Sequence, residues 1–149
     1  MGRQTMSNVS DILKTKGKTI WSVKPQDTVF NTIKVMAERN VGAVLVLENE
    51  KISGIFSERD FIRHCAKGNI HLEQALIKDM MTSHILSVAP NTTTDECMSI
   101  MTTKRIRHLP VLENEKLIGL ISIGDVVNRI IEDHKFSINQ LERYVQGEL

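Results

Sequence analysis

Two short motifs of the form Ser-x-x-Asp carry the side chains best suited to hold a small ligand. They read Ser57-Glu58-Arg59-Asp60 and Ser122-Ile123-Gly124-Asp125, and each follows a short apolar run. The carboxylate of such an Asp can accept hydrogen bonds from both hydroxyls of a ribose, and the Ser hydroxyl and nearby backbone N–H groups can hold a phosphate. The same residues also make an ordinary helix N-cap, with Asp in the first turn. The motif alone leaves both interpretations open.

A basic cluster, Lys104-Arg105-Ile106-Arg107-His108, precedes the second motif. Its cations suit the C-terminal end of a helix, where they favour the dipole, or a bound phosphate. Because Arg107 and His108 begin an apolar run typical of a buried strand, we expect one of them to point inward. The equivalent positions in the first half of the chain are Gly42 and Ala43, which would leave room for a flat ring. The two halves therefore differ in polarity.

Two further residues have a binding and a structural interpretation. Arg59 lies inside the first motif, where the second has Gly124, and is either a phosphate ligand or an exposed arginine in a helical first turn. Trp21 is the only tryptophan, and we expect it in the core or an interface, with stacking on a base as the alternative.

No catalytic or metal-binding pattern occurs in the sequence. The five histidines lack metal-ligand spacing, and there is no Ser/His/Asp order, P-loop or G-x-G-x-x-G. Cys65 and Cys97 form no C-x-x-C pair, so we predict reduced, partly buried thiols. With a net charge of +1, few aromatic residues and only a short basic cluster, nucleic-acid binding is not expected. We therefore predict a protein that is not an enzyme.

Composition bounds the fold class. The chain has 149 residues, 41% of them hydrophobic and 25% charged, which is typical of one compact domain or of one module built from two small repeats. No apolar run approaches the length of a membrane span, and no signal-peptide pattern is present. We expect a soluble, cytoplasmic protein without membrane contact.

The elements that position the motifs occur twice. Residues 20–60 match residues 85–125 at 15 of 41 positions, without a gap. The matches include a proline, a glycine, a polar turn and the Ser-x-x-Asp motif itself. Each copy is too small to close its own core, so we expect the two to pack together with pseudo-twofold symmetry.

Each copy reads as strand–helix–strand–strand–helix, preceded by a short lead-in helix. The first copy has strands at 20–23, 43–47 and 52–56, with helices that begin at Asp27 or Thr28 and at Ser57. The second copy has strands at 85–88, 107–112 and 117–121, with helices over 93–104 and 122–133. Lead-in helices are predicted over 7–15 and 72–81, and a last helix, after a polar break, over 137–146. The corresponding segments are a tail and lead-in helix (1–18), repeat 1 (19–68), a linker with lead-in helix (69–83), repeat 2 (84–134) and a C-terminal helix (135–149).

On these residues the chain resembles a tandem pair of cystathionine β-synthase (CBS) domains, a Bateman module. The pattern Gly-hydrophobic-hydrophobic-Ser/Thr-x-x-Asp appears as Gly54–Asp60 and Gly119–Asp125, and Arg105–Val111 is similar to the second-strand signature of the family. The resemblance covers about residues 7–134. It implies an α+β fold of two pseudo-twofold related βαββα repeats, with three-stranded sheets packed together and flanked by short terminal helices. It also implies a homodimer.

The resemblance further implies two clefts that bind adenosine compounds. Asp would hold the ribose, strand backbone and apolar side chains the adenine, and basic residues the phosphates. One site would use Ser57, Arg59, Asp60, Gly42, Ala43, Ser83, His84 and Ile85. The other would use Ser122, Asp125, Thr19, Ile20, Trp21, Arg107 and His108. The sequence departs from the family pattern at Leu45, which replaces the proline seen at Pro110, and at Trp21, which is large enough to fill the second pocket.

These features predict a non-enzymatic regulatory module that signals to an unknown protein target. Arg59, Arg107 and His108 favour a ligand with at least one phosphate, so AMP is the first choice; NAD(H), ATP and ADP stay open. The alternative is an interaction protein with empty clefts, for example a regulator of thioredoxin-type partners. The form Ser57-Glu58-Arg59-Asp60 is similar to small stand-alone bacterial proteins of this family and to plant organellar relatives, which are implicated in regulating thioredoxin.

Overall fold

The structure, a computed structural model, describes residues 6–145 and divides into two compact units. The first, here called the repeat-1 unit, is Thr19–Leu86. The second, the repeat-2 unit, combines Ser87–Leu149 with the N-terminal segment Met1–Lys18. The predicted tail over residues 1–5 and the end of the predicted last helix at Gln146 lie outside the described residues.

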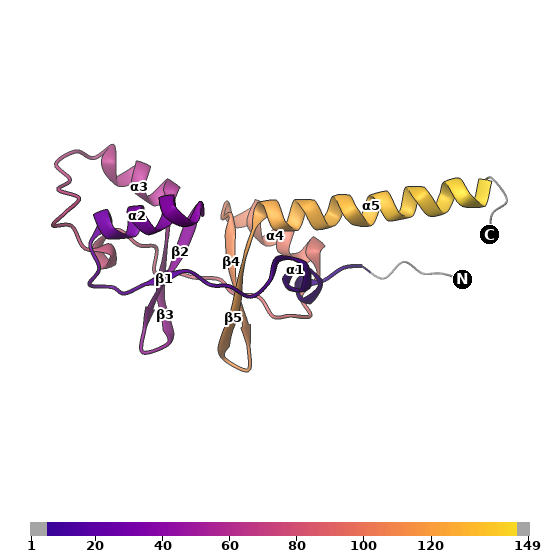
Figure 1. The fold of residues 1–149 in the computed structure, drawn as a ribbon, viewed down its shortest axis with the longest axis horizontal. Coiled ribbons are helices and arrows are strands. Elements are labelled where there is room, and N and C mark those ends of the chain that lie inside the picture. Colours follow the sequence, from indigo (N-terminus) through magenta and orange to yellow (C-terminus); the bar gives the residue numbers. More distant parts are fainter. Residues whose placement is uncertain (1–5, 146–149) are drawn as a thin grey trace. The chain divides into compact units, whose positions relative to one another are not determined.

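The repeat-1 unit contains one three-stranded sheet with two helices (Figure 1). The order is β1 (Ser22–Val23), α2 (Val29–Arg39), β2 (Ala43–Glu48), β3 (Lys51–Ser57), α3 (Glu58–Cys65) and the short 3-10 helix η1 (Ile77–Asp79). β1 runs parallel to the central strand β2, and β2 pairs antiparallel with β3. The central strand reads Ala-Val-Leu-Val and is buried at all four positions, as the continuous apolar run predicts.

The repeat-2 unit repeats this plan with one strand reduced. It contains α1 (Val9–Lys16), α4 (Thr94–Lys104), β4 (His108–Glu113), β5 (Lys116–Ser122) and α5 (Ile123–Val145). β4 and β5 pair antiparallel. The strand predicted over 85–88 is present only as a parallel bridge between Val88 and Val111, bonded through the N–H and C=O of Val88.

The two hairpins have the same turn. Asn49 and Glu50 have φ of 52° and 66°, and Asn114 and Glu115 have φ of 51° and 66°. Two consecutive residues with positive φ are the geometry of a type I′ turn, whose twist matches that of the flanking strands. Each hairpin therefore ends in the same register, with a Ser-x-x-Asp motif immediately after its second strand.

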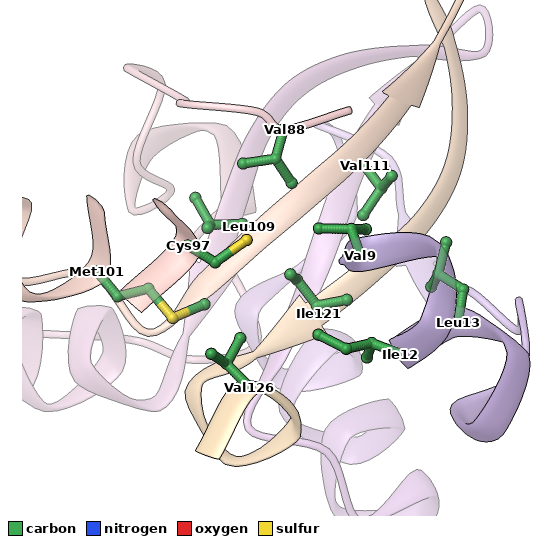
Figure 2. Packing of buried hydrophobic residues seen from close by; sticks show 10 residues of the cluster. All are labelled: Val9, Ile12, Leu13, Val88, Cys97, Met101, Leu109, Val111, Ile121 and Val126. Atoms are coloured by element: carbon green, nitrogen blue, oxygen red, sulfur yellow. The ribbon is translucent and has the colours of Figure 1, made fainter. Parts of the chain in front are cut away.

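The two lead-in segments, α1 before repeat 1 and residues 72–81 before repeat 2, exchange places. Each packs into the unit formed by the repeat that it does not precede. Val9, Ile12 and Leu13 of α1 belong to the core of the repeat-2 unit, where Figure 2 shows them beside Val111 and Ile121. In the repeat-1 unit, Ile77 and Met80 from the segment after α3 are buried in the core. The core of each repeat is therefore completed by the residues that precede the other repeat in the sequence.

The helix predicted over 72–81 is wrong. The segment contains only η1, because backbone groups in its first half bond to the start of α2 instead of forming a continuous helical ladder. The carbonyl oxygens of Leu72 and Ala75 accept from the N–H groups of Phe30 and Val29 at 3.0 and 2.8 Å. These donors have no partner inside α2, so the segment caps that helix at the cost of its own helical bonds.

The polar break predicted between 133 and 137 is also wrong, because α5 runs unbroken from Ile123 to Val145. Neither glycine nor proline occurs at this place, and Ser137 donates its hydroxyl to the carbonyl oxygen of Asp133 at 3.1 Å. This is the bond by which serine fits a helix interior. Among residues 6–145, no helix combines the length and apolar character that a bilayer span requires.

Candidate functional site

The first Ser-x-x-Asp motif forms the junction between β3 and α3. Ser57 caps α3: its hydroxyl accepts from the N–H of Asp60 at 3.3 Å, and Oδ2 of Asp60 accepts from the N–H of Ser57 at 2.9 Å. The hydroxyl of Ser57 also donates to Oδ2 at 3.1 Å. Asp60 is 5% exposed. The helix-cap interpretation of the motif is therefore confirmed, and it fixes the carboxylate rigidly at the N-terminus of a helix.

Thr82 supplies a further close contact of this carboxylate. Its hydroxyl donates to Oδ1 of Asp60 at 2.9 Å, and its N–H and C=O bond reciprocally to Ile55 of β3 at 2.8 and 2.9 Å. Arg63 reaches Oδ1 only at 3.9 Å. The backbone pairing brings Ser83, His84 and Ile85, which directly follow Thr82, to this junction.

Gly42 and Ala43 lie on the other side of the same junction. Ala43 is opposite Ser57 in the β2–β3 register, and the carbonyl oxygen of Gly42 accepts from the N–H of Glu58 at 3.0 Å. Arg59 is exposed in the first turn of α3. The structure thus gathers the residues of the first predicted site on the repeat-1 unit.

Gly54 allows the lead-in segment to approach β3 closely. A Cβ atom at this position would lie 2.5 Å from the sulfur of Met81 and 2.9 Å from the carbonyl oxygen of Thr82. Gly119 has the same role in the repeat-2 unit, where a Cβ atom would lie 2.7 Å from Cδ2 of Leu13. The glycine before each motif is therefore needed by the lead-in segment that covers it.

The second motif forms the junction between β5 and α5. Ser122 accepts from the N–H of Asp125 at 3.1 Å, and Oδ2 of Asp125 accepts from the N–H of Ser122 at 2.8 Å. Lys16, at the end of α1, donates to the same Oδ2 at 2.6 Å and to the carbonyl oxygen of Leu120 at 2.7 Å. The two junctions thus share one cap, but a neutral hydroxyl contacts the first carboxylate and an ammonium contacts the second.

The charge of Asp125 is stabilised in this setting. Burial raises the pKa of its carboxyl, but the Lys16 ammonium and the bonds from Ser122 outweigh burial and hold the pKa below its usual value. Asp125 is therefore ionised at neutral pH and keeps its capacity as a hydrogen-bond acceptor. Among the described residues, none donates a hydrogen bond to Oδ1 of Asp125.

Arg107 and His108 occupy the positions of Gly42 and Ala43 at the second junction. His108 is opposite Ser122 in the β4–β5 register, and the carbonyl oxygen of Arg107 accepts from the N–H of Ile123 at 2.8 Å. Arg107 is exposed and His108 is half-buried. Burial, then the Lys16 charge and the Arg107 charge, lower the pKa of His108 against the opposing effect of Asp125. His108 is therefore a neutral imidazole near pH 7, not a second cation.

The remaining residues of the second predicted site belong to the repeat-1 unit. Thr19 is exposed, Ile20 and Trp21 are half-buried, and the carbonyl oxygen of Trp21 accepts from the N–H of Leu45 at 3.2 Å. The guanidinium of Arg39 lies 4.2 Å from the centre of the Trp21 ring, a cation–π contact. The second predicted set is thus divided between the two units.

The repeat-1 unit also has an apolar groove between α2 and α3, with a cavity of about 420 Å³. Ile33, Met36 and Ile62 line it, together with Phe56 and Phe61; Gly42 and Glu58 lie at the end nearest the first junction. Asp60 does not line it. The groove is therefore a separate feature of this unit and does not belong to the carboxylate site.

Sequence reasoning missed Thr82 and Lys16, which contact the two carboxylates. The available signal was the repeat itself: at the offset of 65 residues that relates Asp60 to Asp125, Thr82 falls on Gly17, the neighbour of Lys16. Lys16 and Thr82 both lie at the end of a lead-in segment. The repeat therefore indicates where a contact to each carboxylate could come from, although the residue types differ.

The thiols lie in contrasting surroundings. Cys97 is fully buried, and burial, with Glu96 nearby, raises the pKa of its thiol to about 11. Cys65 is exposed, so the prediction of partial burial is wrong for this residue. Within residues 6–145, no group of three or more His, Cys, Asp or Glu side chains is arranged to hold a metal ion.

Comparison with known proteins places these features in one family. The sequence profile of the CBS domain matches residues 9–67 and again residues 77–132. A curated relative, the "CBS domain-containing protein CBSX3, mitochondrial" of Arabidopsis thaliana, is 34% identical over 95% of this chain and 73% of its own length.

Solved structures show the same fold. A putative signal-transduction protein with CBS domains from Burkholderia ambifaria is 44% identical, with a TM-score of 0.82 over 85% of this chain and 96% of its own. The CBS domain pair of protein MJ0100, solved in complex with 5′-methylthioadenosine and S-adenosyl-L-methionine, is 18% identical, with a TM-score of 0.74 over 86% of this chain and 98% of its own. These matches confirm the predicted α+β architecture of two βαββα repeats.

Proposed function

Because this chain belongs to the CBS-domain family and carries the domain twice, we propose that it is a non-enzymatic regulatory module that binds an adenine nucleotide. AMP is the first candidate, with NAD(H), ATP and ADP as alternatives. The observation that carries the proposal is the pair of carboxylates, Asp60 and Asp125, each fixed by a capping serine at the N-terminus of a helix. A cytoplasmic location stays a prediction.

Each junction has the groups that a ribose 5′-phosphate requires. A carboxylate accepts hydrogen bonds from a diol, and the start of a helix favours a negatively charged phosphate. Asp60 accepts short hydrogen bonds from the hydroxyls of Ser57 and Thr82, and ribose hydroxyls would compete with these neutral donors. In the protein MJ0100, which shares the fold, the bound molecules are adenosine derivatives, which supports this class of ligand.

Lys16 gives the second junction a further role. Its ammonium is bonded to Asp125 in the ligand-free chain, so a ribose that takes Asp125 displaces it or shares the carboxylate with it. An ammonium released there would be free to pair with a phosphate held at the same helix N-terminus. We therefore expect the second junction to prefer phosphorylated adenosines, with Lys16 and Arg107 as the cations and His108 as a neutral donor.

The regulatory output would pass through a homodimer and an unknown protein target. The apolar groove of the repeat-1 unit suits a second copy, because Ile62 at its edge is 67% exposed and the other lining side chains are mainly aliphatic or aromatic. A nucleotide that displaces Lys16 from Asp125 would change how α1 packs on the repeat-2 unit. Such a coupling is how a ligand shifts a population between two states.

One observation favours the alternative of an interaction protein without a ligand. Lys16 on Asp125 and Arg39 on Trp21 both occupy side chains of the second predicted site. If these contacts persist, both side chains stay occupied and the chain acts through its surfaces alone.

Calorimetry with AMP, ADP, ATP, NAD, NADH and S-adenosylmethionine tests the proposal. We expect saturable binding that Asp60→Asn or Asp125→Ala weakens by about 1.5–3 kcal/mol, the scale of a lost hydrogen bond to a charged group. Glu96→Ala is the matched control, because the Glu96 carboxylate bonds to the capping Thr93 at the start of α4 and Glu96 belongs to neither predicted site. Absence of binding across the panel, with the variants folded, would contradict the proposal and favour the interaction protein.

A further inference from the structure

The last turns of α5 carry an apolar stripe that no described residue covers. Ile138, Leu141 and Val145 are 56, 64 and 77% exposed, and Ile131 before them is 44% exposed. In Figure 1 the yellow end of α5 continues past α1 and α4, which belong to the same unit. Helices draw most of their stability from packing of an apolar face. An extension of this kind is therefore expected to pack on a partner.

The stripe has the spacing of a coiled-coil seam. Its positions alternate by four and three residues, which is the a/d pattern of a heptad. They are Val127, Ile131, His134, Ile138, Leu141 and Val145. The residues of α5 that pack on the core of their own unit are different ones, Ile123, Val126 and Ile130. The seam thus lies beside the core-facing side of α5 and is available to another helix.

The flanking charges identify the partner as the same segment in the opposite direction. Lys135 and Glu142 both stand at e positions of this heptad. In an antiparallel pair, e faces e of the other helix, so Lys135 of one copy meets Glu142 of a second copy, and twofold symmetry makes the pair twice. In a parallel pair the same residues would face Ile130 and Ser137, with no charge complement.

We propose that residues 134–145 of α5 form an antiparallel helix pair with the same residues of a second copy. Ile138 of each copy packs against Leu141 of the other, and His134 against Val145. Lys135 exchanges its 3.9 Å contact with Glu132, which is exposed and therefore weak, for Glu142 of the second copy. This contact is distinct from the groove between α2 and α3, and it does not depend on the proposed function.

The contact is expected to be weak alone. The paired segments overlap over about 18 Å of helix at 1.5 Å per residue, and the contact buries less than the roughly 1,000 Å² typical of an independently stable interface. It therefore acts as a second, concentration-dependent step that links chains or dimers formed elsewhere.

Sedimentation equilibrium of the full chain, from roughly 10 µM to 1 mM, measures this step. We expect Leu141→Glu to weaken the concentration-dependent association at least tenfold, because it places two carboxylates in the seam. Phe136→Glu is the matched control: Phe136 is 57% exposed on the same helix but lies away from the seam, so it should leave the association unchanged. Circular dichroism verifies that both variants keep their helix content. Equal association curves for wild type and Leu141→Glu would overturn the proposal.

Charge reversal tests the antiparallel direction. Lys135→Glu or Glu142→Lys alone creates two like-charge pairs and should weaken association about fivefold to tenfold at low salt. The double variant restores both pairs in reversed order and should return to within about threefold of wild type. A double variant no stronger than the single ones would overturn the antiparallel register. Nucleotide binding by Leu141→Glu is measured separately. The association result can therefore be interpreted even if the chain binds no nucleotide.

Discussion

The Nζ atom of Lys16 lies 2.6 Å from Oδ2 of Asp125, although the two residues are 109 positions apart in the chain. This pair connects the end of α1 to the start of α5. At the first junction the corresponding carboxylate, Asp60, is contacted by the hydroxyl of Thr82 instead. The duplicated motif has therefore kept its cap but changed its long-range partner from a neutral group to a cation.

Replacing Lys16 by Met should lower the free energy of unfolding at pH 7 by about 0.5–1 kcal/mol, because both partners are partly exposed and solvent screens the pair. The pKa of Asp125 is lowered in the folded state, so the stabilisation is present above the unfolded pKa and is lost as pH falls through the folded one. Chemical denaturation at pH 7 and pH 3 should show the difference at pH 7 and a smaller one in acid. Lys14→Met, an exposed change on the same helix, is the control. An equal loss at both pH values would contradict the ion pair as the cause.

Removing the hydroxyl of Thr82 should cost more than its size suggests. Thr82→Val leaves Oδ1 of the buried Asp60 without its short hydrogen bond, and we expect a loss of about 1–3 kcal/mol in urea denaturation. Thr82→Ser keeps the donor and removes only a methyl group, so it should retain most of the stability. If Val and Ser behave alike, packing and not the hydrogen bond holds this segment.

Two glycines near the motifs should respond in opposite ways to alanine. Gly54→Ala places a Cβ atom 2.9 Å from the backbone oxygen of Thr82, which cannot yield easily, so we expect a loss of about 1–3 kcal/mol. Gly124→Ala lies in the first turn of α5 with only the Ser122 hydroxyl within 4 Å, and should be neutral or stabilising by up to about 1 kcal/mol. Thermal melting of both variants measures the contrast. A stable Gly54→Ala variant would show that the lead-in segment is not tightly seated.

His108 should titrate below the usual histidine range. Burial and the charges of Lys16 and Arg107 lower its pKa, so the folded state holds the imidazole neutral while the unfolded chain protonates it near pH 6.5. Its contribution to stability is complete above that pH and falls as pH drops from the unfolded pKa toward the folded one. NMR titration of the imidazole measures the shift, with the urea-unfolded chain as reference. Bound phosphate should raise this pKa, and a ligand-independent value would argue against His108 as a phosphate contact.

The local parts of both junctions could be predicted from the sequence, because they depend on contacts between residues three apart. A serine followed three residues later by an aspartate can cap a helix that begins after a strand. Ser57 with Asp60 and Ser122 with Asp125 both do so. The matching turns, Asn49-Glu50 and Asn114-Glu115, close their hairpins in the same register for the same local reason. Predictions that needed only such contacts were confirmed.

Predictions failed at two segments whose residue types allow more than one hydrogen-bond arrangement. The segment over 72–81 has helical periodicity, but the carbonyl groups of Leu72 and Ala75 accept from the start of α2 and not from N–H groups of their own segment. The break expected near Ser137 does not occur, because its hydroxyl bonds back to Asp133 within the helix. The first choice was decided by a partner distant in the chain, and the second by a serine side chain that is tolerated in turns and in helices alike.

By itself the sequence determined that two equivalent repeats each end in a capped carboxylate, because repetition at one offset and i to i+3 capping are properties of the chain read in order. Only the tertiary structure decided that Lys16 contacts Asp125 and Thr82 contacts Asp60. Those contacts arise because each repeat leaves one apolar face of its sheet uncovered, and the lead-in segment of the other repeat packs on that face. No short-range rule states which face that will be.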